Sequence, residues 1–404
     1  MKRLLSLLLL LVPASLLLAQ EQVRVWKEGD SKRFTTSEIL FSEDGTVFSI
    51  GDSTYNYAEV DSITVVHTVT VTFSGETASV DLGHAKDVTY EVDGAHVNIL
   101  STNTKSELEF VVQGESTQGS LTYDGPLKCK FYLNGLNLTS DRGAAIDIQC
   151  GKRIDLILMD GTENVLVDAA GGTQKAAFYC KGHLEVSGSG SLTVTGNTKH
   201  AIATKEYLEL KKSTGSITVL GAVSDAMHIG QYFQMNGGTL NLSGMGGEGI
   251  QVEILTLDDD VTPNPDKENN GLTFIKGGNI TIDVANELSK GIKAPGDMTI
   301  SGGTFNITAS GNGSRGIQTS GNLLINEDDG TTLIQIRAAG TIYEDPITED
   351  ETRCCGIRVK GNLTATAGTI RISNTGKYSY GIYINGTYTK SGTAVVSASI
   401  KTKE

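Results

Sequence analysis

A dipeptide of one small and one apolar residue recurs along this chain at a nearly fixed spacing. Its basic period is 23–25 residues, with three longer steps. A period in this range is typical of a solenoid, in which each turn packs only on its neighbours. Equivalent residues of successive turns then form columns, and an exposed column suits a long repeating ligand. The copies are Ala145-Ile146, Ala177-Phe178, Ala201-Ile202, Ala226-Met227, Gly249-Ile250, Gly291-Ile292, Gly316-Ile317, Gly356-Ile357 and Gly381-Ile382.

Each repeat holds three short segments in which two apolar residues flank a central one, as in 250–252, 208–210 and 217–219. In a strand, this alternation turns the flanking residues inwards and the central residue outwards. Three strands per repeat predict a triangular turn, which a leucine-rich repeat does not have. We therefore predict an all-β fold, a right-handed parallel β-helix of about nine turns over residues 127–404. Its inward column includes Ile146, Phe178, Ile202, Met227, Ile250, Ile292, Ile317, Ile357 and Ile382.

Residues 1–19 have a short basic start, a run of leucines and an ending at Ala19-Gln20. This pattern indicates a secretory signal peptide. No later segment approaches the ~20 consecutive apolar residues that a membrane-spanning helix needs. We therefore expect an exported protein, whether periplasmic, cell-surface or secreted.

Two segments precede the regular repeats. Residues 20–66 are predicted to form a small β appendage or spacer, and residues 67–126 a β cap. A cap is expected because a stack of parallel strands otherwise ends in unpaired backbone groups. Two repeats carry insertions, at 254–271 and 340–354, which we expect to project as surface loops.

Charge and cysteine content narrow the function. The formal net charge is −14, so a nucleic-acid partner is not expected, because phosphates require a basic surface. An acidic polysaccharide would need a local basic strip or bridging cations. The cysteines have neither zinc-ligand spacing nor an even-numbered disulfide framework, which favours buried small hydrophobic residues over a functional pair. They are Cys129, Cys150, Cys180, Cys354 and Cys355.

Three motifs carry a family resemblance. Residues 133–138 read Leu-Asn-Gly-Leu-Asn-Leu, residues 156–164 end in Asp-Gly-Thr-Glu-Asn, and residues 188–194 read Gly-Ser-Gly-Ser-Leu-Thr-Val. Over roughly residues 68–400 the chain resembles secreted bacterial carbohydrate-binding proteins with a right-handed β-helix similar to that of pectate lyases. The resemblance implies polysaccharide binding, with acidic plant polymers such as polygalacturonate favoured, and bound calcium.

The chain departs from this family at the position before each small residue. Family turns typically read Asp-Gly-Ile there, which supplies a column of carboxylates. Here only Asp225 and Glu248 are acidic at that position. The resemblance therefore supports calcium on this column only at the step between these two residues.

The outward column that follows each small-apolar pair is the predicted carbohydrate-binding surface. Equivalent residues of adjacent turns are about 4.8 Å apart. The column contains aromatic, amide and cationic side chains, which bind hydroxyl groups, pair with carboxylates and stack on sugar rings. The alternative is that these are ordinary solvated strand residues. The predicted binding residues are Tyr179, His228, Gln251, Lys293, Gln318, Arg358 and Tyr383.

Two groups of carboxylates are candidate calcium ligands. Asp225 and Glu248 are expected to stack on adjacent turns, where like charges need a cation, a proton or separation into solvent. Calcium takes 6–8 oxygen ligands, so backbone carbonyls would complete such a site. The second group is Asp258, Asp260 and Asp266, whose loop lacks the ligand order of a calcium-binding hand, which favours a merely acidic, soluble loop over a calcium site.

The sequence favours an exported, non-catalytic protein that binds acidic, uronate-containing polysaccharides with calcium. One alternative is a calcium-dependent polysaccharide lyase, with Lys293 or Arg315 as the base. We expect the acidic residues to lie two or three turns from these bases, which argues against it. A hydrolase would need carboxylates facing each other across a site, and no such pair is visible. A third class is a structural or adhesive stalk whose insertions carry the contacts.

Overall fold

The computed structural model describes residues 22–28, 30–34, 39–257 and 261–403. Nearly all regular structure in these residues is β-strand, apart from the short 3₁₀-helix η2 (Tyr57–Glu59). No helix in the described ranges is long and apolar enough to cross a membrane. The expected signal peptide (1–19) lies outside the described residues.

A sheet of 13 strands runs along one side of the molecule, and we call it the site sheet. Its strands pair in parallel from β9 to β42, while β8 pairs antiparallel with β9 at the edge. In spatial order they are β8 (Val88–Asp93), β9 (Ala95–Ser101), β11 (Gly119–Asp124), β13 (Ile146–Ile148), β16 (Ala176–Cys180), β19 (His200–Thr204), β22 (Met227–Ile229), β25 (Ile250–Val252), β28 (Lys290–Ala294), β31 (Arg315–Thr319), β36 (Cys355–Val359), β39 (Tyr380–Ile384) and β42 (Ile400–Thr402).

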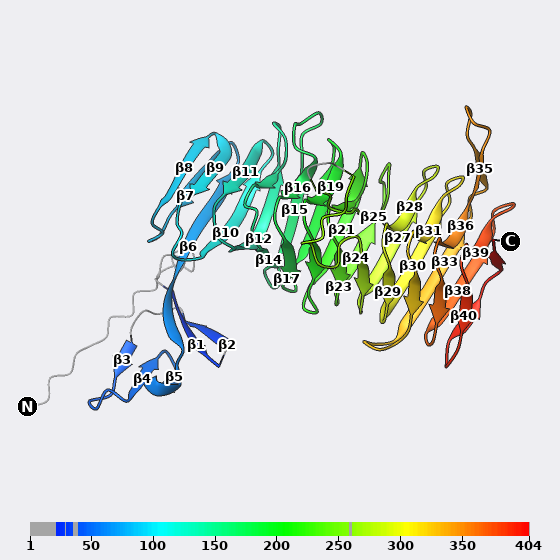
Figure 1. Ribbon diagram of the computed structural model, residues 1–404. Helices are drawn as coiled ribbons and strands as arrows, with labels where there is room; N and C mark the ends of the chain where they lie inside the picture. Colours follow the sequence, from blue (N-terminus) through cyan, green and yellow to red (C-terminus); the bar gives the residue numbers. More distant parts are fainter. Residues whose placement is uncertain (1–21, 29, 35–38, 258–260, 404) are drawn as a thin grey trace, which may run out of the picture.

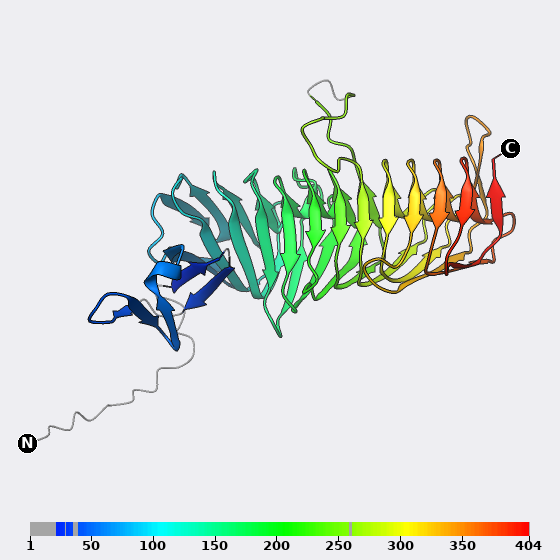
Figure 2. The ribbon, with the colours of Figure 1, turned by 60° about the horizontal axis from the view of Figure 1, so that its bottom comes forward.

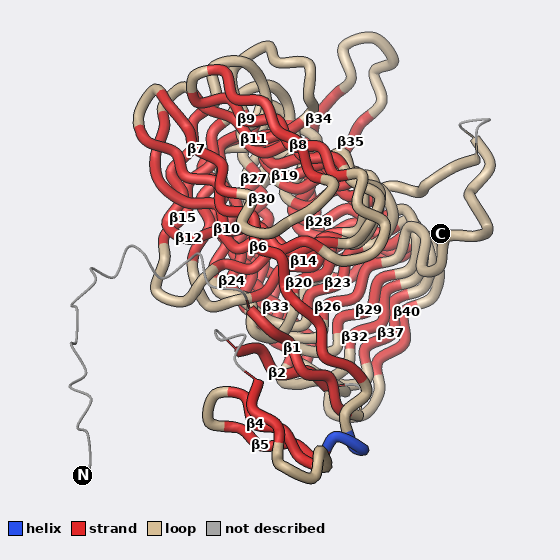
Figure 3. The backbone as a smooth tube through the Cα atoms, turned by 90° about the vertical axis from the view of Figure 1, so that its left-hand side faces the viewer, coloured by secondary structure: helices blue, strands red, loops and turns tan. Residues whose placement is uncertain are grey.

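Two further parallel ladders complete each turn. The second ladder contains β14 (Ile154–Leu158), β17 (Leu184–Ser187), β20 (Leu208–Leu210), β23 (Phe233–Met235), β26 (Thr273–Ile275), β29 (Met298–Ile300), β32 (Leu323–Ile325), β37 (Leu363–Ala365) and β40 (Tyr388–Lys390). The third contains β15 (Glu163–Val167), β18 (Ser191–Gly196), β21 (Ser216–Ala222), β24 (Thr239–Leu242), β27 (Asn279–Val284), β30 (Gly303–Ala309), β33 (Thr332–Ala338), β38 (Thr369–Asn374) and β41 (Val395–Ser397). The turns follow one another along a single axis (Figures 1 and 3), as in a solenoid.

The interior of the coil is a continuous apolar core. The burial alternates along the strands, as in β14, whose residues alternate buried and half-buried. Every residue of the predicted inward column is at most 4% exposed, from Ile146 to Ile382. The predicted inward register is therefore confirmed, and burial of this column stabilises each turn against the next.

Close packing between turns explains the small residue of the repeated dipeptide. A Cβ atom on Gly291 would lie 2.5 Å from the carbonyl oxygen of Gly316. A Cβ atom on Gly316 would lie 2.7 Å from the carbonyl oxygen of Gly356. Because such contacts are shorter than van der Waals distance, these turns require glycine, whereas the earlier turns accept alanine at the same position.

The regular coil starts earlier than residue 127. The long strand β12 (Cys129–Thr139) feeds both the second and third ladders, and pairs in parallel with β10 (Leu108–Ser116). In turn β10 pairs in parallel with β6 (Ser62–Ser74), which β7 (Thr77–Asp81) covers in antiparallel fashion. The predicted cap over 67–126 is thus largely coil, because only β7 and β8 depart from parallel pairing there.

A small N-terminal β unit is joined to the first turns of the coil through strand pairing. The strand β1 (Gln22–Lys27) pairs antiparallel with β2 (Asp30–Phe34) and with β6, and a second small sheet contains β3 (Ile39–Phe41), β4 (Val47–Ile50) and β5 (Ser53–Asn56). This unit has its own small apolar core. Arg24 and Arg33 join it to the coil through the buried Glu109, at 2.7 and 2.6 Å.

Both insertions project from the coil (Figure 2), the first after β25 and the second before β36. The first is described in part, with an isolated bridge between Thr256 and Pro263. The second folds as a hairpin of β34 (Ile342–Glu344) and β35 (Glu351–Arg353). All five cysteines are free and buried, as the sequence predicted.

Candidate functional site

Two neighbouring columns of side chains form a polar strip along the site sheet. The first column is the predicted one, because the strand register aligns Asp147, Tyr179, Ala203, His228, Gln251, Lys293, Gln318, Arg358 and Tyr383 in that order. The second column stands three residues earlier in each turn, and contains His200, Asp225, Glu248, Lys290, Arg315, Cys355 and Tyr380. We call the part of both columns that runs from His200 to Tyr383 the polar strip.

The first column is less exposed than a row of solvated strand residues. Gln251 is 4% exposed and Gln318 is 6% exposed, because neighbouring side chains cover them. The amide of Gln251 donates to Glu253 Oε1 at 2.7 Å, and Gln318 accepts a hydrogen bond from Arg315. Tyr179 is half-buried, which raises the pKa of its hydroxyl. The side chains of the strip therefore form a fixed network.

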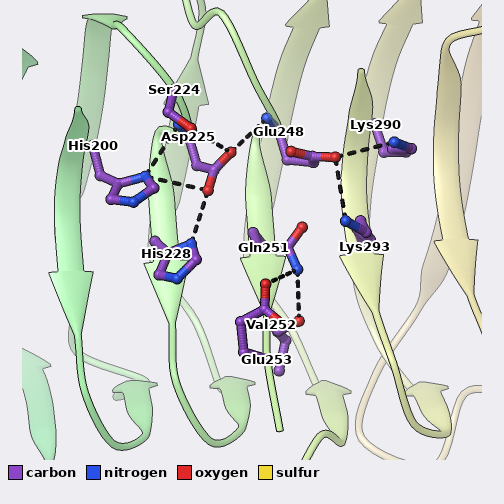
Figure 4. A network of polar contacts seen from close by, with 10 residues as sticks. All are labelled: His200, Ser224, Asp225, His228, Glu248, Gln251, Val252, Glu253, Lys290 and Lys293. Carbon is purple, nitrogen blue, oxygen red and sulfur yellow. Dashed lines mark hydrogen bonds and ion pairs between the residues drawn. The ribbon is translucent and has the colours of Figure 1, made fainter. Parts of the chain in front are cut away.

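At the N-terminal end of the strip, Asp225 is the centre of a buried network (Figure 4). Its Oδ2 lies 2.8 Å from His228 Nδ1 and 3.2 Å from His200 Nδ1, while its Oδ1 accepts the Glu248 backbone N–H at 2.9 Å. Burial alone would raise the pKa of Asp225, but these contacts outweigh it and hold the pKa well below its usual range. Asp225 is thus an ionised, fully engaged carboxylate.

The expected Asp225–Glu248 calcium pair does not form. The Glu248 carboxylate turns away from Asp225 and lies 3.1 Å from Lys290 Nζ and 3.5 Å from Lys293 Nζ. Two ammonium groups already neutralise it, and the groups facing the Asp225 side chain are imidazoles. Calcium prefers a shell of oxygen ligands, so this set of donors does not fit it.

One of the predicted separations between acids and bases is wrong, that between Glu248 and Lys293. The long step from Gly249 to Gly291 is an insertion within one turn, because β25 pairs directly with β28. Glu248 and Lys293 therefore lie on adjacent turns and form an ion pair, rather than standing two or three turns apart. Of the second carboxylate group, Asp258 and Asp260 lie outside the described residues, and Asp266 is exposed in its loop.

At the C-terminal end of the strip, a cleft of about 290 Å³ opens between the site sheet and the hairpin. We call it the cationic cleft. Its lining combines guanidinium groups and phenol rings with a single carboxylate. The lining residues are Arg315, Glu351, Thr352, Arg353, Cys355, Arg358, Tyr380 and Tyr383.

Arg358 is held firmly in this cleft. Its guanidinium carbon lies 4.1 Å from the centre of the Tyr383 ring, a cation–π contact. Its Nη2 donates to Asn385 Oδ1 at 2.7 Å, and Nη1 donates to the Val359 carbonyl oxygen at 3.0 Å. Burial lowers the pKa of Arg358. These contacts orient the guanidinium group without neutralising its charge.

Arg315 and Arg353 complete the cleft from opposite sides. Arg315 donates to Gln318, its buried Nε has no hydrogen-bond partner, and burial lowers its pKa. Arg353 lies on β35, with its guanidinium carbon 5.5 Å from the Tyr380 ring centre and Nη2 3.3 Å from Glu351. Within the described ranges, Arg315 and Arg358 have no ion-pair partner. Uncompensated, partly buried charges of one sign mark a candidate site for a ligand of the opposite sign.

Two other depressions have fewer cations or cations that already pair with carboxylates. The third ladder carries a groove of about 530 Å³ lined by isoleucines and by hydroxyl and amide groups, with Arg337, Arg371 and Asp283. A cleft of about 340 Å³ beside Trp26 contains Glu109, whose carboxylate Arg24 and Arg33 already neutralise. The cationic cleft is therefore the strongest candidate for an acidic ligand.

The fold and the polar strip define a parallel β-solenoid with a cationic cleft on its site sheet. The chain belongs to the family described as carbohydrate-binding domain-containing protein, whose family model matches residues 93–399. A curated protein of Acetivibrio thermocellus with the same description is 26% identical over 129 residues, 30% of this chain. The match spans only 45% of that relative's length.

One solved structure supports the fold. It is described as the polysaccharide lyase-like protein from C. thermocellum, as a gadolinium derivative. It superposes with a TM-score of 0.52 and 22% identity, covering 65% of this chain and 98% of the other. This likeness shows the solenoid fold, while the site must be argued from the residues of this chain.

Proposed function

We propose that this is an exported, non-catalytic carbohydrate-binding protein whose ligand is an acidic polysaccharide with uronate units. Membership of the carbohydrate-binding family supports a polysaccharide ligand. The cationic cleft carries the acidic preference, because three guanidinium groups there face one carboxylate, Glu351.

The chemistry of the cleft suits a carboxylate-bearing sugar. Guanidinium groups bind carboxylates through paired, charge-assisted hydrogen bonds, and they lose less hydration energy than ammonium groups do. Tyr380 and Tyr383, with ring centres 5.4 Å apart, offer aromatic surface for a sugar ring. Both residues belong to the polar strip, so a polymer bound in the cleft can extend along the strip toward Lys293.

The proposal is tested by measuring binding of the mature chain to polygalacturonate and to its methyl-esterified form by isothermal titration calorimetry. Esterification removes the carboxylate charges and keeps the sugar backbone, so binding to the ester is expected to be at least tenfold weaker, about the contribution of one charged hydrogen bond. Equal affinity for both polymers would show that carboxylates are not recognised. A protein that binds neither polymer would instead fit a structural stalk.

Calcium dependence stays a prediction. The Asp225–Glu248 step does not fit the ion, and Asp258 and Asp260 lie outside the described residues. Repeating the titration with a chelator tests it, because loss of polygalacturonate binding on chelation would show that calcium takes part.

A polysaccharide lyase is the second candidate, because cations and a carboxylate meet on the strip. Lys290 and Lys293 flank Glu248, and Arg315 has a pKa lowered by burial and an unpaired Nε. In such a lyase, a base removes the proton next to the uronate carboxyl group and the glycosidic bond breaks. Ultraviolet-absorbing unsaturated products, lost in Lys293→Ala or Arg315→Ala, would establish this activity against the non-catalytic proposal.

A further inference from the structure

Three side chains at the N-terminal end of the polar strip converge on one point that the carbohydrate proposal does not use. His200, Asp225 and His228 each offer one ligand atom, and these atoms lie within 4.8 Å of one another. Both Nδ1 atoms approach the same carboxylate oxygen, at 2.8 Å for His228 and 3.2 Å for His200. In Figure 4 the three side chains point toward one another from adjacent turns.

These separations are those of ligands around a small ion. Nitrogen and oxygen ligands of a tetrahedral Zn²⁺ stand at ~2.0–2.2 Å from it, and so about 3.3 Å from one another. The two imidazole rings are nearly parallel, with centres 4.2 Å apart and planes 20° from parallel. An ion bound by both Nδ1 atoms lies in the plane of each ring, so one of the two stacked imidazoles must turn about its side-chain bonds when the ion binds.

His200 is buried, and the contacts of its Nδ1 atom conflict with one another. The residue is 1% exposed, and its Nε2 has no hydrogen-bond partner. Its Nδ1 faces both the Asp225 backbone N–H, at 3.3 Å, and the Asp225 carboxylate. A neutral ring cannot satisfy both at once, because the first contact needs a lone pair on Nδ1 and the second needs a proton. A cation bound at Nδ1 removes the repulsion between that lone pair and the carboxylate.

We propose that His200, Asp225 and His228 bind a divalent transition-metal ion such as Zn²⁺. Two imidazoles and one carboxylate suit first-row transition metals and not Ca²⁺, which takes oxygen ligands. The Glu248 N–H fixes the Asp225 carboxylate through Oδ1, as an outer-shell partner does. The His228 side chain is 28% exposed, so the ion has a route from solvent and a coordination position open to water. The proposal does not depend on the carbohydrate function.

The test uses the mature full-length chain without a histidine tag, treated with a chelator and then titrated with Zn²⁺ by calorimetry. Binding of Co²⁺, followed by its visible absorption, reports whether nitrogen ligands and low coordination are present. The main variant is His228→Gln, because His228 is the most exposed of the three ligands. The matched control is His183→Gln, which removes another imidazole that pairs with a carboxylate, Glu206, and stacks on a ring, Tyr207, at 4.3 Å.

The parent is expected to bind one equivalent of Zn²⁺, to show the Co²⁺ bands and to melt at a higher temperature with Zn²⁺. His228→Gln should weaken Zn²⁺ binding by more than about 100-fold, beyond the loss of an outer-shell partner. His183→Gln should bind Zn²⁺ as the parent does, and circular dichroism without metal checks that both variants are folded at the temperature of the titration. The proposal is overturned if the parent binds no Zn²⁺, or if His228→Gln binds it as tightly as the parent.

Discussion

The two ends of the polar strip are built from similar residue types but differ in how their charges are matched. At the N-terminal end, Asp225 is surrounded by two imidazoles and Glu248 by two lysines. At the C-terminal end, Arg315 and Arg358 have no carboxylate within ion-pair distance in the described part of the chain. The same strand register therefore yields one end at which the carboxylates are paired with cations of the protein. At the other end, two guanidinium groups have no carboxylate partner in the described residues.

The difference separates groups that hold the fold from groups that are available to a ligand. Removing one member of a buried, matched pair leaves an uncompensated charge, so the N-terminal end should be sensitive in stability. Unmatched cations add little stability, but they provide attraction for an anion.

Replacing Asp225 by Asn should lower the free energy of unfolding by about 3 kcal/mol, because it removes the charge from a buried network. The measurement is the midpoint of denaturant unfolding in the presence of a chelator. Asp266→Asn is the matched control, because Asp266 is exposed in its loop, and it should change stability by less than about 0.5 kcal/mol. Equal midpoints for the two variants would show that the Asp225 network contributes little.

Replacing Arg358 by Gln should weaken polygalacturonate binding about 10- to 100-fold, the value of a hydrogen bond to a charged group. Lys293→Gln, on the same column, should change the affinity by less than about threefold, because Glu248 already pairs with Lys293. Arg142→Gln controls for net charge, since Arg142 pairs with Asp93 outside the strip. A larger loss in Lys293→Gln than in Arg358→Gln would reverse the assignment of the two ends.

Acid should weaken a neighbouring matched group at the N-terminal end. Burial alone would raise the pKa of Glu206, but the contacts with His183 and Lys267 have a larger effect and lower the pKa to about 2. Because the folded pKa lies below the ordinary value of 4.5, the stabilisation is complete above pH 4.5 and disappears as the pH falls toward 2. Glu206→Gln should therefore cost about 1–2 kcal/mol at pH 7, allowing for partial exposure, and much less near pH 2. The measurement is the unfolding midpoint of the parent and of Glu206→Gln at both pH values. An equal loss of stability at pH 7 and near pH 2 would contradict the prediction.

Replacing Tyr383 by Leu should have the smallest effect, a two- to fivefold loss of polygalacturonate affinity. The ring supports the Arg358 guanidinium at 4.1 Å, and an exposed cation–π contact contributes about 0.5–1 kcal/mol. Tyr383→Phe keeps a ring and should retain most of the affinity. If Tyr383→Phe and Tyr383→Leu lowered the affinity for polygalacturonate equally, the hydroxyl group and not the ring would be the important part of Tyr383.

The core and the strand register could be predicted from the sequence because both follow from short-range patterns. Alternation fixes which residues of each strand face inwards, and the repeat length fixes which residues stack, so Ile292 and Arg358 were placed in the right columns. The start of the coil was predicted too late, because the strands β6 to β11 lack the repeated small-apolar dipeptide.

The contacts within the site could not be predicted in the same way. The repeat correctly places Asp225 and Glu248 on adjacent turns. It does not show that the Asp225 side chain contacts imidazoles while the Glu248 side chain contacts lysines, because these directions depend on neighbours in three dimensions. Arg353 was missed because it lies on a hairpin insertion, whose path the repeat period does not determine. The departure of Lys290 and Arg315 from the acidic family pattern was the visible signal of a cationic strip.

We propose above that the cationic cleft holds the carboxylate of an acidic sugar. A crystal structure of the protein with a short galacturonate oligomer tests it most directly. The account predicts a sugar carboxylate within hydrogen-bond distance of the Arg358 or Arg315 guanidinium group, with a ring against Tyr380 or Tyr383. An oligomer bound instead in the groove of the third ladder, beside Arg337 and Arg371, would contradict it.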